Sequence, residues 1–222
     1  TTEIYTLSLH DALPIYPLVR RGFGVFREGL SAYMVAEYIE GKPLSEILSS
    51  NASGISFEQA GVWAHNILEA LQFAHQHDIY HQNLNPYNIV IDSQNRARVI
   101  GIGKQRAAWL SSEGNVKYHH PILYIAPEVY RDKRCSTESD VYSWAVILYQ
   151  ILCGVLPWRV ESYLSPEAQK QQSLTHAILM PEIIGKVVPD WLFTILLACL
   201  NNEASERYSI AFIMEVISTN VD

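Results

Sequence analysis

The chain has 222 residues, of which 49% are hydrophobic and 18% are charged, and this composition permits a substantial core and excludes a disordered chain. Its formal net charge of −7, from 16 basic and 23 acidic residues, excludes the basic footprint of a nucleic-acid-binding protein. The length suits one large domain or two small ones.

The first part of the chain predicts a hairpin followed by a long helix. Two short runs rich in aromatic and β-branched residues, 17–26 and 31–39, flank the turn-like sequence REG and predict an antiparallel pair. The sequence GKPLSEILSS then predicts a turn and a short helix, with Pro43 just inside the helix. From Ser56 to His77 apolar residues recur at helical spacing, and Ser56 is placed to cap this helix.

The rest of the chain predicts two short strands and then only helices. The loop HQNLNPYN comes first, and its Pro86 keeps Asn85 out of helical geometry. YNIVI and ARVIGIG, separated by the turn DSQN, predict the strands, and residues 103–125 predict a long irregular loop. Helices are expected over 139–153, 165–178, 189–200 and 210–217. This order of elements predicts an α+β fold dominated by helix.

Neither the cysteines nor the histidines predict a metal site. Cys135, Cys153 and Cys199 lie far apart without a CxxC pair, so we interpret them as reduced thiols of an intracellular protein. The HQH and HH pairs lack further ligands at suitable spacing. Residues 141–158 are mostly apolar, and this length fits either a short membrane span or a buried core helix.

Six short motifs follow one another along the chain: VAEYIEGKPL, HQNLNPYN, GIG at 101–103, APE at 126–128, SDVYSWAVILYQILCGVLPW and ERYS. Together they resemble the protein kinase family over residues 17–217. There they correspond to the hinge, the catalytic loop H-R-D-L-x-x-x-N, the D-F-G position, the intact APE, the core helix of the large lobe and the late arginine motif. The NLNPYN pattern is most similar to the serine/threonine branch. The resemblance implies that residues 141–158 form a buried helix and not a membrane span.

The same resemblance implies that the catalytic loop lacks its charges. The family uses an aspartate to accept the proton of the substrate hydroxyl, and here Asn83, a neutral amide, stands at that position. Gly101 replaces the aspartate that holds Mg²⁺. Asn85 replaces the lysine two residues after the base, and Gln82 replaces the arginine that responds to phosphorylation of the activation loop. Asn88, a metal ligand in the family, is kept.

Four other matching residues have structural roles in the family. His81 packs into the core, and Asp140 accepts hydrogen bonds from the loop backbone. Glu128 pairs with Arg207 and tethers the activation segment. These roles do not depend on catalysis, so the resemblance implies them for an inactive chain as well.

The small lobe of a kinase is represented by few residues. Glu37, Tyr38 and Ile39 occupy the hinge positions that bind the nucleotide in the family. GFGVF at 22–26 lacks the third glycine of a phosphate loop and is followed by no V-A-I-K, so we interpret it as the fourth strand of the small lobe. Residues 1–15 do not resemble kinase sequence and look like a translated sequencing adapter.

We therefore expect an α+β, protein-kinase-like fold with a mainly helical large lobe and a remnant β-hairpin of the small lobe. Residues 1–15 are expected to be a non-native leader, 16–40 the small-lobe strand remnant with the hinge, and 41–222 the kinase-like large lobe.

The expected function is that of a pseudokinase, a catalytically impaired kinase-like domain that acts as a binding or regulatory module. We expect a protein partner, a cytoplasmic location, no nucleic acid, no membrane span and no cofactor. The alternative is a truncated serine/threonine kinase that transfers phosphate from ATP to protein, in which ATP and Mg²⁺ would bind. A truncated chain without independent function is the third possibility.

Overall fold

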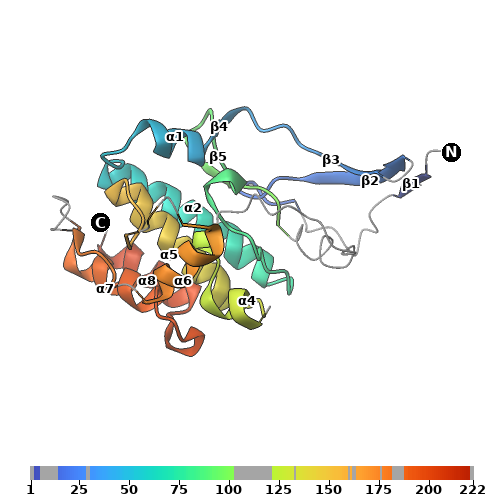
Figure 1. Ribbon diagram of the computed structural model, residues 1–222. Helices are drawn as coiled ribbons and strands as arrows, with labels where there is room; N and C mark the ends of the chain where they lie inside the picture. Colours follow the sequence, from blue (N-terminus) through green and yellow to red (C-terminus); the bar gives the residue numbers. More distant parts are fainter. Residues whose placement is uncertain are drawn as a thin grey trace.

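The helices of the chain gather into one body, and the strands lie along its edge and beyond it (Figure 1). The computed structural model describes residues 3–5, 15–28, 31–102, 122–132, 134–159, 161, 164–175, 177–181 and 188–220. Most of the loop predicted over 103–125 lies outside these residues, and its described end contains a 3₁₀ turn, η2 (Ile122–Tyr124).

Within the described residues the strands form two three-stranded antiparallel sheets. The first has the order β1 (Glu3–Tyr5), β2 (Gly22–Glu28), β3 (Ser31–Ala36), and the second has the order β4 (Gly41–Pro43), β5 (Ile89–Asp92), β6 (Ala97–Val99). The predicted hairpin is the β2–β3 pair, with Val25 opposite Met34. The predicted strands YNIVI and ARVIGIG are β5 and β6, although β6 ends at Val99.

Strand β4 corrects the prediction of a plain turn at residues 41–43. Gly41 pairs with Asp92 so closely that a Cβ atom on Gly41 would lie 2.2 Å from the carbonyl oxygen of Ile91. Pro43 ends this strand and precedes the first turn of the next helix instead of lying inside it. A short strand of three exposed residues has no alternation of apolar and polar residues that could predict it.

The described helices are α1 (Leu44–Ser50), α2 (Phe57–His75), α4 (Pro127–Asp132), α5 (Thr137–Cys153), α6 (Pro166–Thr175), α7 (Asp190–Cys199) and α8 (Ile210–Asn220). Helix α4 was not predicted from the sequence. The predicted cap of α2 is present, because the Oγ atom of Ser56 accepts a hydrogen bond from the N–H group of Gln59. The helix ends two residues earlier than predicted, at His75.

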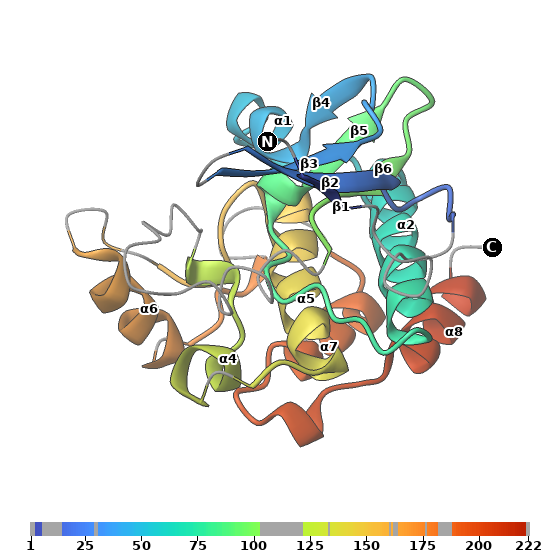
Figure 2. The same cartoon turned by 90° about the vertical axis from the view of Figure 1, so that its right-hand side faces the viewer.

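Helix α5 is the centre of the body, with α2 on one side and α4 and α6 on the other (Figure 2). Its residues 139–149 are all buried, and the indole N–H group of Trp144 donates to the carbonyl oxygen of Ala64 on α2 at 3.1 Å. A capping box of Ser136 and Ser139 begins the helix, and Gly154, at φ 75°, ends it. Burial on every side explains why residues 141–149 are mostly apolar. None of the helices in the described part of the chain is long and apolar enough to cross a membrane.

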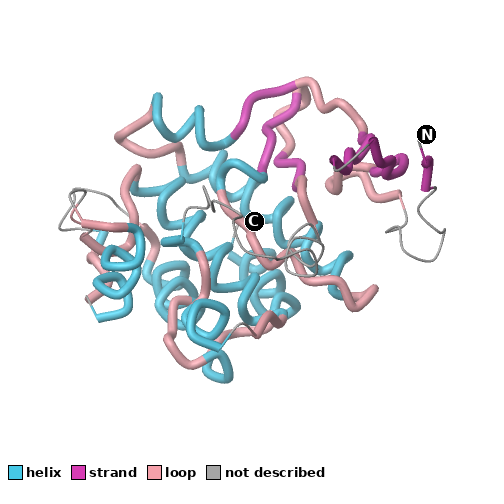
Figure 3. Tube along the Cα trace, turned by 45° about the vertical axis from the view of Figure 1, so that its right-hand side comes forward, coloured by secondary structure: helices cyan, strands magenta, loops and turns pink. Residues whose placement is uncertain are grey.

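The sheet of β1, β2 and β3 stands apart from the helical body (Figure 3). Its base is joined to β6 through the backbone, because the N–H group of Val99 donates to Leu18 and that of Arg20 donates to Val99. Phe26 and Tyr33 stack on each other across the β2–β3 pair with ring centroids 4.9 Å apart. The side chain of Tyr33 is nevertheless 46% exposed, so little of the helical body covers this sheet.

Candidate functional site

The loop between α2 and β5, residues 81–88, is held in place by the carboxylate of Asp140 at the start of α5. Asp140 Oδ2 accepts the backbone N–H group of His81 at 2.8 Å, and Oδ1 accepts that of Gln82 at 3.0 Å. Gln82 has φ 69°, a left-handed backbone conformation that is energetically unfavourable for any residue other than glycine. The hydrogen bond that Gln82 donates to Asp140 holds it in this conformation, and Asp140 is itself almost fully buried. The loop therefore has a specified backbone shape.

Two histidines, His75 and His81, also help to fix the position of this loop. The ring of His81 is fully buried, and its Nε2 atom lies 3.2 Å from the carbonyl oxygen of Ile100, to which it donates. His75, the last residue of α2, donates from Nε2 to Asp140 Oδ2 at 2.8 Å. The sequence interpretation assigned His81 to the core but missed the link between His75 and Asp140. The only sequence signal for that link was the HQH pair, which was considered as a metal site.

Three asparagine side chains form one hydrogen-bonded cluster in the loop. The Nδ2 atom of Asn85 donates to the backbone oxygen of Asn83 at 2.8 Å and to its Oδ1 atom at 3.1 Å. The Nδ2 atom of Asn88 donates to the same backbone oxygen at 2.9 Å. Asn85 also accepts the N–H group of Tyr87 at 2.9 Å and so caps the 3₁₀ turn η1 (Pro86–Asn88). Neutral amides thus occupy the positions predicted from the sequence, and they bond to one another.

Gly101 lies beside this cluster, two residues beyond β6. Ile100, its neighbour in the chain, donates its N–H group to Asn88 at 2.9 Å, which keeps the two segments together. Gly101 has φ 82°, a conformation that glycine adopts without penalty and that other residues adopt at a cost. It offers no side-chain atom to a ligand.

These residues do not fit a magnesium ion. Mg²⁺ prefers octahedral oxygen ligands and is usually held in proteins by one or two carboxylates together with phosphate oxygens. Asn83, Asn85, Asn88 and Gly101 bring no carboxylate. In the described part of the chain no group of three or more histidine, cysteine, aspartate or glutamate residues could hold a metal ion.

The hinge residues differ from one another in their surroundings. The carboxylate of Glu37 accepts from Arg98 Nη2 at 2.9 Å and from the backbone of Arg21 at 3.2 Å. Burial alone would raise the pKa of Glu37, but these hydrogen bonds and the positive charge of Arg98 lower it below the usual value. Tyr38 is 88% exposed, and Ile39 is half-buried. The Glu37 side chain is therefore committed to an ion pair with β6.

Glu128 on α4 and Arg207 are brought together, as the sequence motifs predicted. Arg207 Nη1 donates to Glu128 Oε1 at 2.7 Å, and Nη2 donates to Oε2 at 2.8 Å. Burial would raise the pKa of Glu128, but the bonds from Arg207 and from the Ser139 hydroxyl lower it. The side chain of Arg207 is fully buried and also stacks over the ring of Tyr142, with its Cζ atom 5.0 Å from the ring centroid.

Lys170 on α6 was missed by the sequence interpretation. Its side chain is fully buried, and its Nζ atom donates to the carbonyl oxygen of Ile125, just before α4. The ammonium position lies 5.3 Å from the ring centroid of Tyr142 and 6.0 Å from that of Trp158. Burial lowers the pKa of Lys170 to about 7. The sequence of α6, PEAQKQQSLT, is mostly polar, so its pattern of apolar and polar residues does not distinguish this buried lysine from an exposed one.

Comparison with known sequences decides the family. The protein kinase domain, as a sequence family, matches residues 3–218 of this chain. The chain belongs to the protein kinase family. The predicted family and the predicted α+β kinase-like fold are thereby confirmed, and the membrane alternative for residues 141–158 is wrong because residues 141–153 belong to the buried helix α5.

Several serine/threonine-protein kinases are similar to this member of the kinase family. PrkC of Bacillus subtilis is 28% identical over 187 residues, which cover 82% of this chain and 28% of PrkC. PknB of Mycolicibacterium smegmatis is 32% identical over 167 residues, covering 70% of this chain and 26% of PknB. PDK1 of Cryptococcus neoformans is 26% identical over 205 residues, covering 89% of this chain and 16% of PDK1. The chain thus spans less than a third of the length of these relatives.

Proposed function

We propose that the chain is a pseudokinase, a catalytically impaired protein-kinase-like domain that acts as a binding or regulatory module. The observation that carries the proposal is the amide cluster of the loop. A kinase needs a carboxylate to accept the proton of the substrate hydroxyl, and general base catalysis contributes about 10²–10⁴-fold to a rate. Asn83 holds that position with an amide that has no basic lone pair, and Asn85 donates to that amide.

The second support is the lack of metal ligands. Phosphoryl transfer depends on the correct placement of the reacting groups and on neutralisation of the phosphate charge. Bound metal ions supply much of this neutralisation. Asn88 could offer one oxygen to such an ion, while Gly101 can offer none. Base and metal ligand are therefore absent from their positions together, and a single compensating residue would not restore both.

The loop nevertheless keeps a defined shape, which favours a binding role over loss of all function. Asp140 and the two histidines still hold the backbone, and the asparagines satisfy one another by hydrogen bonds. We propose a protein as the partner and the cytoplasm as the location, in keeping with the reduced cysteines expected from the sequence.

The test is transfer of radiolabelled phosphate from ATP, with Mg²⁺ or Mn²⁺, to a generic basic protein. We expect no transfer by the chain above the level of an Asn88→Ala variant prepared in parallel, which controls for contaminating kinases. Clear transfer by the unmodified chain that the Asn88→Ala change abolishes would overturn the proposal.

That outcome would favour the second candidate, a serine/threonine kinase seen as a fragment. The observation in its favour is that the similar proteins from Bacillus subtilis and Mycolicibacterium smegmatis are named as serine/threonine-protein kinases. ATP and Mg²⁺ would then have to bind at Asn88 and at the hinge residues Glu37, Tyr38 and Ile39.

A further inference from the structure

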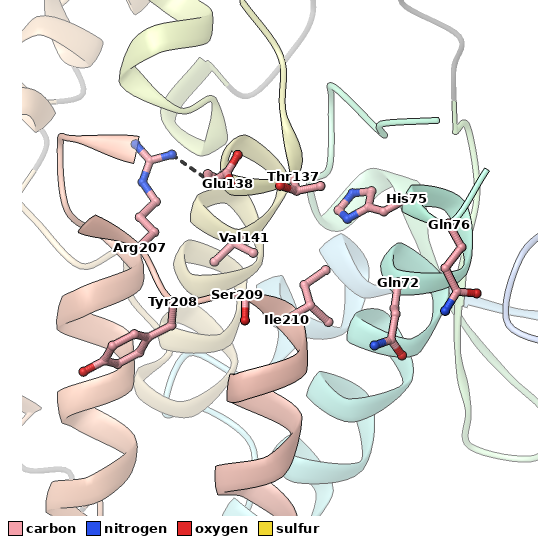
Figure 4. Close-up of a pocket in the computed structure, with 10 residues that line it drawn as sticks. All are labelled: Gln72, His75, Gln76, Thr137, Glu138, Val141, Arg207, Tyr208, Ser209 and Ile210. Carbon is pink, nitrogen blue, oxygen red and sulfur yellow. Dashed lines mark hydrogen bonds between the residues drawn. The ribbon is translucent and has the colours of Figure 1, made fainter. Parts of the chain in front are cut away.

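A pocket of about 380 Å³ opens between the last turn of α2, the first turn of α5 and the start of α8 (Figure 4). Its volume lies within the range of about 300–1,000 Å³ in which proteins bind small ligands, near the lower end. We call it the α2–α5–α8 pocket. It is lined by Gln72, His75, Gln76, Thr137, Glu138, Val141, Arg207, Tyr208, Ser209 and Ile210.

The lining has polar groups at two ends and mostly apolar groups between them. Figure 4 shows Thr137 and Glu138 on one side and Gln72 and Gln76 on the other, with Val141, Ile210 and the ring of His75 between. Val141 and Ile210 are buried members of the hydrophobic core. A ligand that fills this space needs a polar group at each end and an alkyl stem in the middle.

The end at α5 carries a negative charge. Burial would raise the pKa of Glu138, but the hydroxyls of Ser136 and Thr137 and the positive charge of Arg207 lower it, so its carboxyl group is ionised at neutral pH. The Arg207 guanidinium does not compete for a ligand's acceptors, because its donors bond Glu128, Asn201 and the backbone of Glu138.

The wider surroundings are negative as well. Two carboxylates, those of Glu128 and Glu138, lie close to the single guanidinium of Arg207, and the nearby Lys170 has a pKa that burial lowers to about 7. Arg134, in the segment before α5, is exposed and does not line the pocket. The electrostatics therefore select a cationic group at the α5 end.

The other end offers amides. Within the described residues, the side-chain amides of Gln72 and Gln76 make no hydrogen bond to the protein. Gln72 is half-buried in the last turn of α2, and Gln76 is the exposed residue that follows the helix. A primary amide has two donor and two acceptor positions, which match the N–H and C=O groups of a peptide bond.

From these observations we propose that the α2–α5–α8 pocket binds an arginine residue of a partner polypeptide. The guanidinium lies at Thr137 and Glu138, the methylene stem lies over Val141 and Ile210, and the adjacent peptide groups bond Gln72 and Gln76. Arginine suits the site better than lysine, because its planar fork can donate to a carboxylate and to a hydroxyl at once. The proposal goes beyond the pseudokinase function and does not rest on the asparagine cluster.

The test uses three probes and the whole 222-residue chain: N-acetyl-arginine amide, its neutral analogue N-acetyl-citrulline amide, and agmatine, which has the guanidinium and stem without peptide groups. Binding is followed by saturation-transfer NMR titration. We expect saturable binding of the arginine amide, with the citrulline amide at least about tenfold weaker because it has no charge to pair with Glu138. No saturable binding, or equal binding of these two probes, would overturn the proposal.

Variants locate the site. Glu138→Gln should lower the affinity for the arginine amide about tenfold, whereas Glu46→Gln, at an exposed glutamate on α1, should leave this affinity unchanged. The double change Gln72→Ala with Gln76→Ala should lower the affinity for the arginine amide several-fold and leave the affinity for agmatine unchanged. If agmatine binds as tightly as the arginine amide and neither probe responds to this double change, the assignment to a polypeptide is wrong.

A second variant guards against misfolding of Glu138→Gln. Gln72→Lys replaces a partly exposed residue on α2 with another good helix former and places an ammonium group in the pocket. It should abolish binding of the arginine amide while the thermal melt of the protein stays unchanged. Unaltered binding by a folded Gln72→Lys protein would contradict the proposed site.

Discussion

Arg207 holds Glu128 by two parallel hydrogen bonds of 2.7 and 2.8 Å, although the two residues are 79 positions apart in the chain. The guanidinium is fully buried, and it also bonds the backbone oxygens of Asn201 and Glu138. One charged pair thus connects α4, the first turn of α5 and the segment that precedes α8. It joins these elements where no strand or disulfide does so within the described residues.

Removing the carboxylate of Glu128 should therefore destabilise the fold. In Glu128→Ala the Arg207 charge stays buried without its partner, and the loss of one member of a buried pair costs about 3–5 kcal/mol. Urea denaturation should give a correspondingly lower free energy of unfolding. Glu203→Ala, at an exposed glutamate, is the matched control, and an equal effect of the two changes would mean that the pair contributes nothing.

The buried lysine should make stability depend on pH in the alkaline range. The folded pKa of Lys170 is about 7, and the unfolded value is about 10.4. Between these values the unfolded state binds more protons than the folded state, so the free energy of unfolding rises as the pH increases from 7 to 10. Below pH 7 lysine is charged in both states, and its contribution to the slope disappears.

Lys170→Met should remove this slope. The lowered pKa of Lys170 means that its burial destabilises the folded state by about 4 kcal/mol at neutral pH, and the Lys170→Met change removes this cost. The change also leaves the Ile125 oxygen without a hydrogen bond, which offsets about 1–3 kcal/mol of the gain. The variant should therefore be about 1–3 kcal/mol more stable at pH 7. Urea denaturation at pH 7 and pH 9 measures both effects, with the exposed Lys42→Met as control. Equal slopes for the two variants would contradict the assignment.

The separate sheet should make the chain prone to association when residues 16–222 are produced alone. Phe23 is 55% exposed, and Tyr33, Met34 and Val35 are also exposed on β3. Removing β1 leaves the edge of β2 unpaired, and a two-stranded hairpin is marginally stable. We expect light scattering to show aggregates whose size increases with concentration. A monodisperse protein that unfolds cooperatively at high concentration would contradict this expectation.

The sequence predicted the parts of the fold that depend on local pattern. The periodic apolar residues of α2 and its Ser56 cap, the turn between β5 and β6, and the apolar α5 all follow from spacing within a few turns. The Glu128–Arg207 pair was predicted from the kinase motifs and not from spacing. Other residues with long-range partners, such as His75 and Lys170, were missed.

The missed features share a physical cause. β4 exists because Gly41 permits a close backbone approach to Ile91, and Lys170 is buried because α6 packs over Ile125. His75 reaches Asp140 across 65 positions. None of these contacts leaves a period or a motif in the sequence around it, since each depends on where a distant segment is placed. The loop over 103–121 lies outside the described residues and stays a prediction.

The last prediction concerns restored charges in the loop. Asn83→Asp combined with Gly101→Asp would return a base and a metal ligand to their family positions, yet we expect no phosphoryl transfer from the double variant. Gly101 has φ 82°, so an aspartate there would be strained and would either shift the segment beyond β6 or misplace its carboxylate.

The Asn83→Asp change also removes an amide from the asparagine cluster, although Asn85 could still donate to the new carboxylate. Asn85 itself remains neutral where the family has a lysine, and the 222 residues contain no V-A-I-K lysine for the phosphates. Since positioning and charge neutralisation supply most of this catalysis, two carboxylates alone should not be sufficient. The measurement is the radiolabel assay with ATP and Mg²⁺ or Mn²⁺, with each single variant as control. Transfer by the double variant and by neither single variant would mean that the rest of the site is still competent, and that only these two side chains separate the chain from an active kinase.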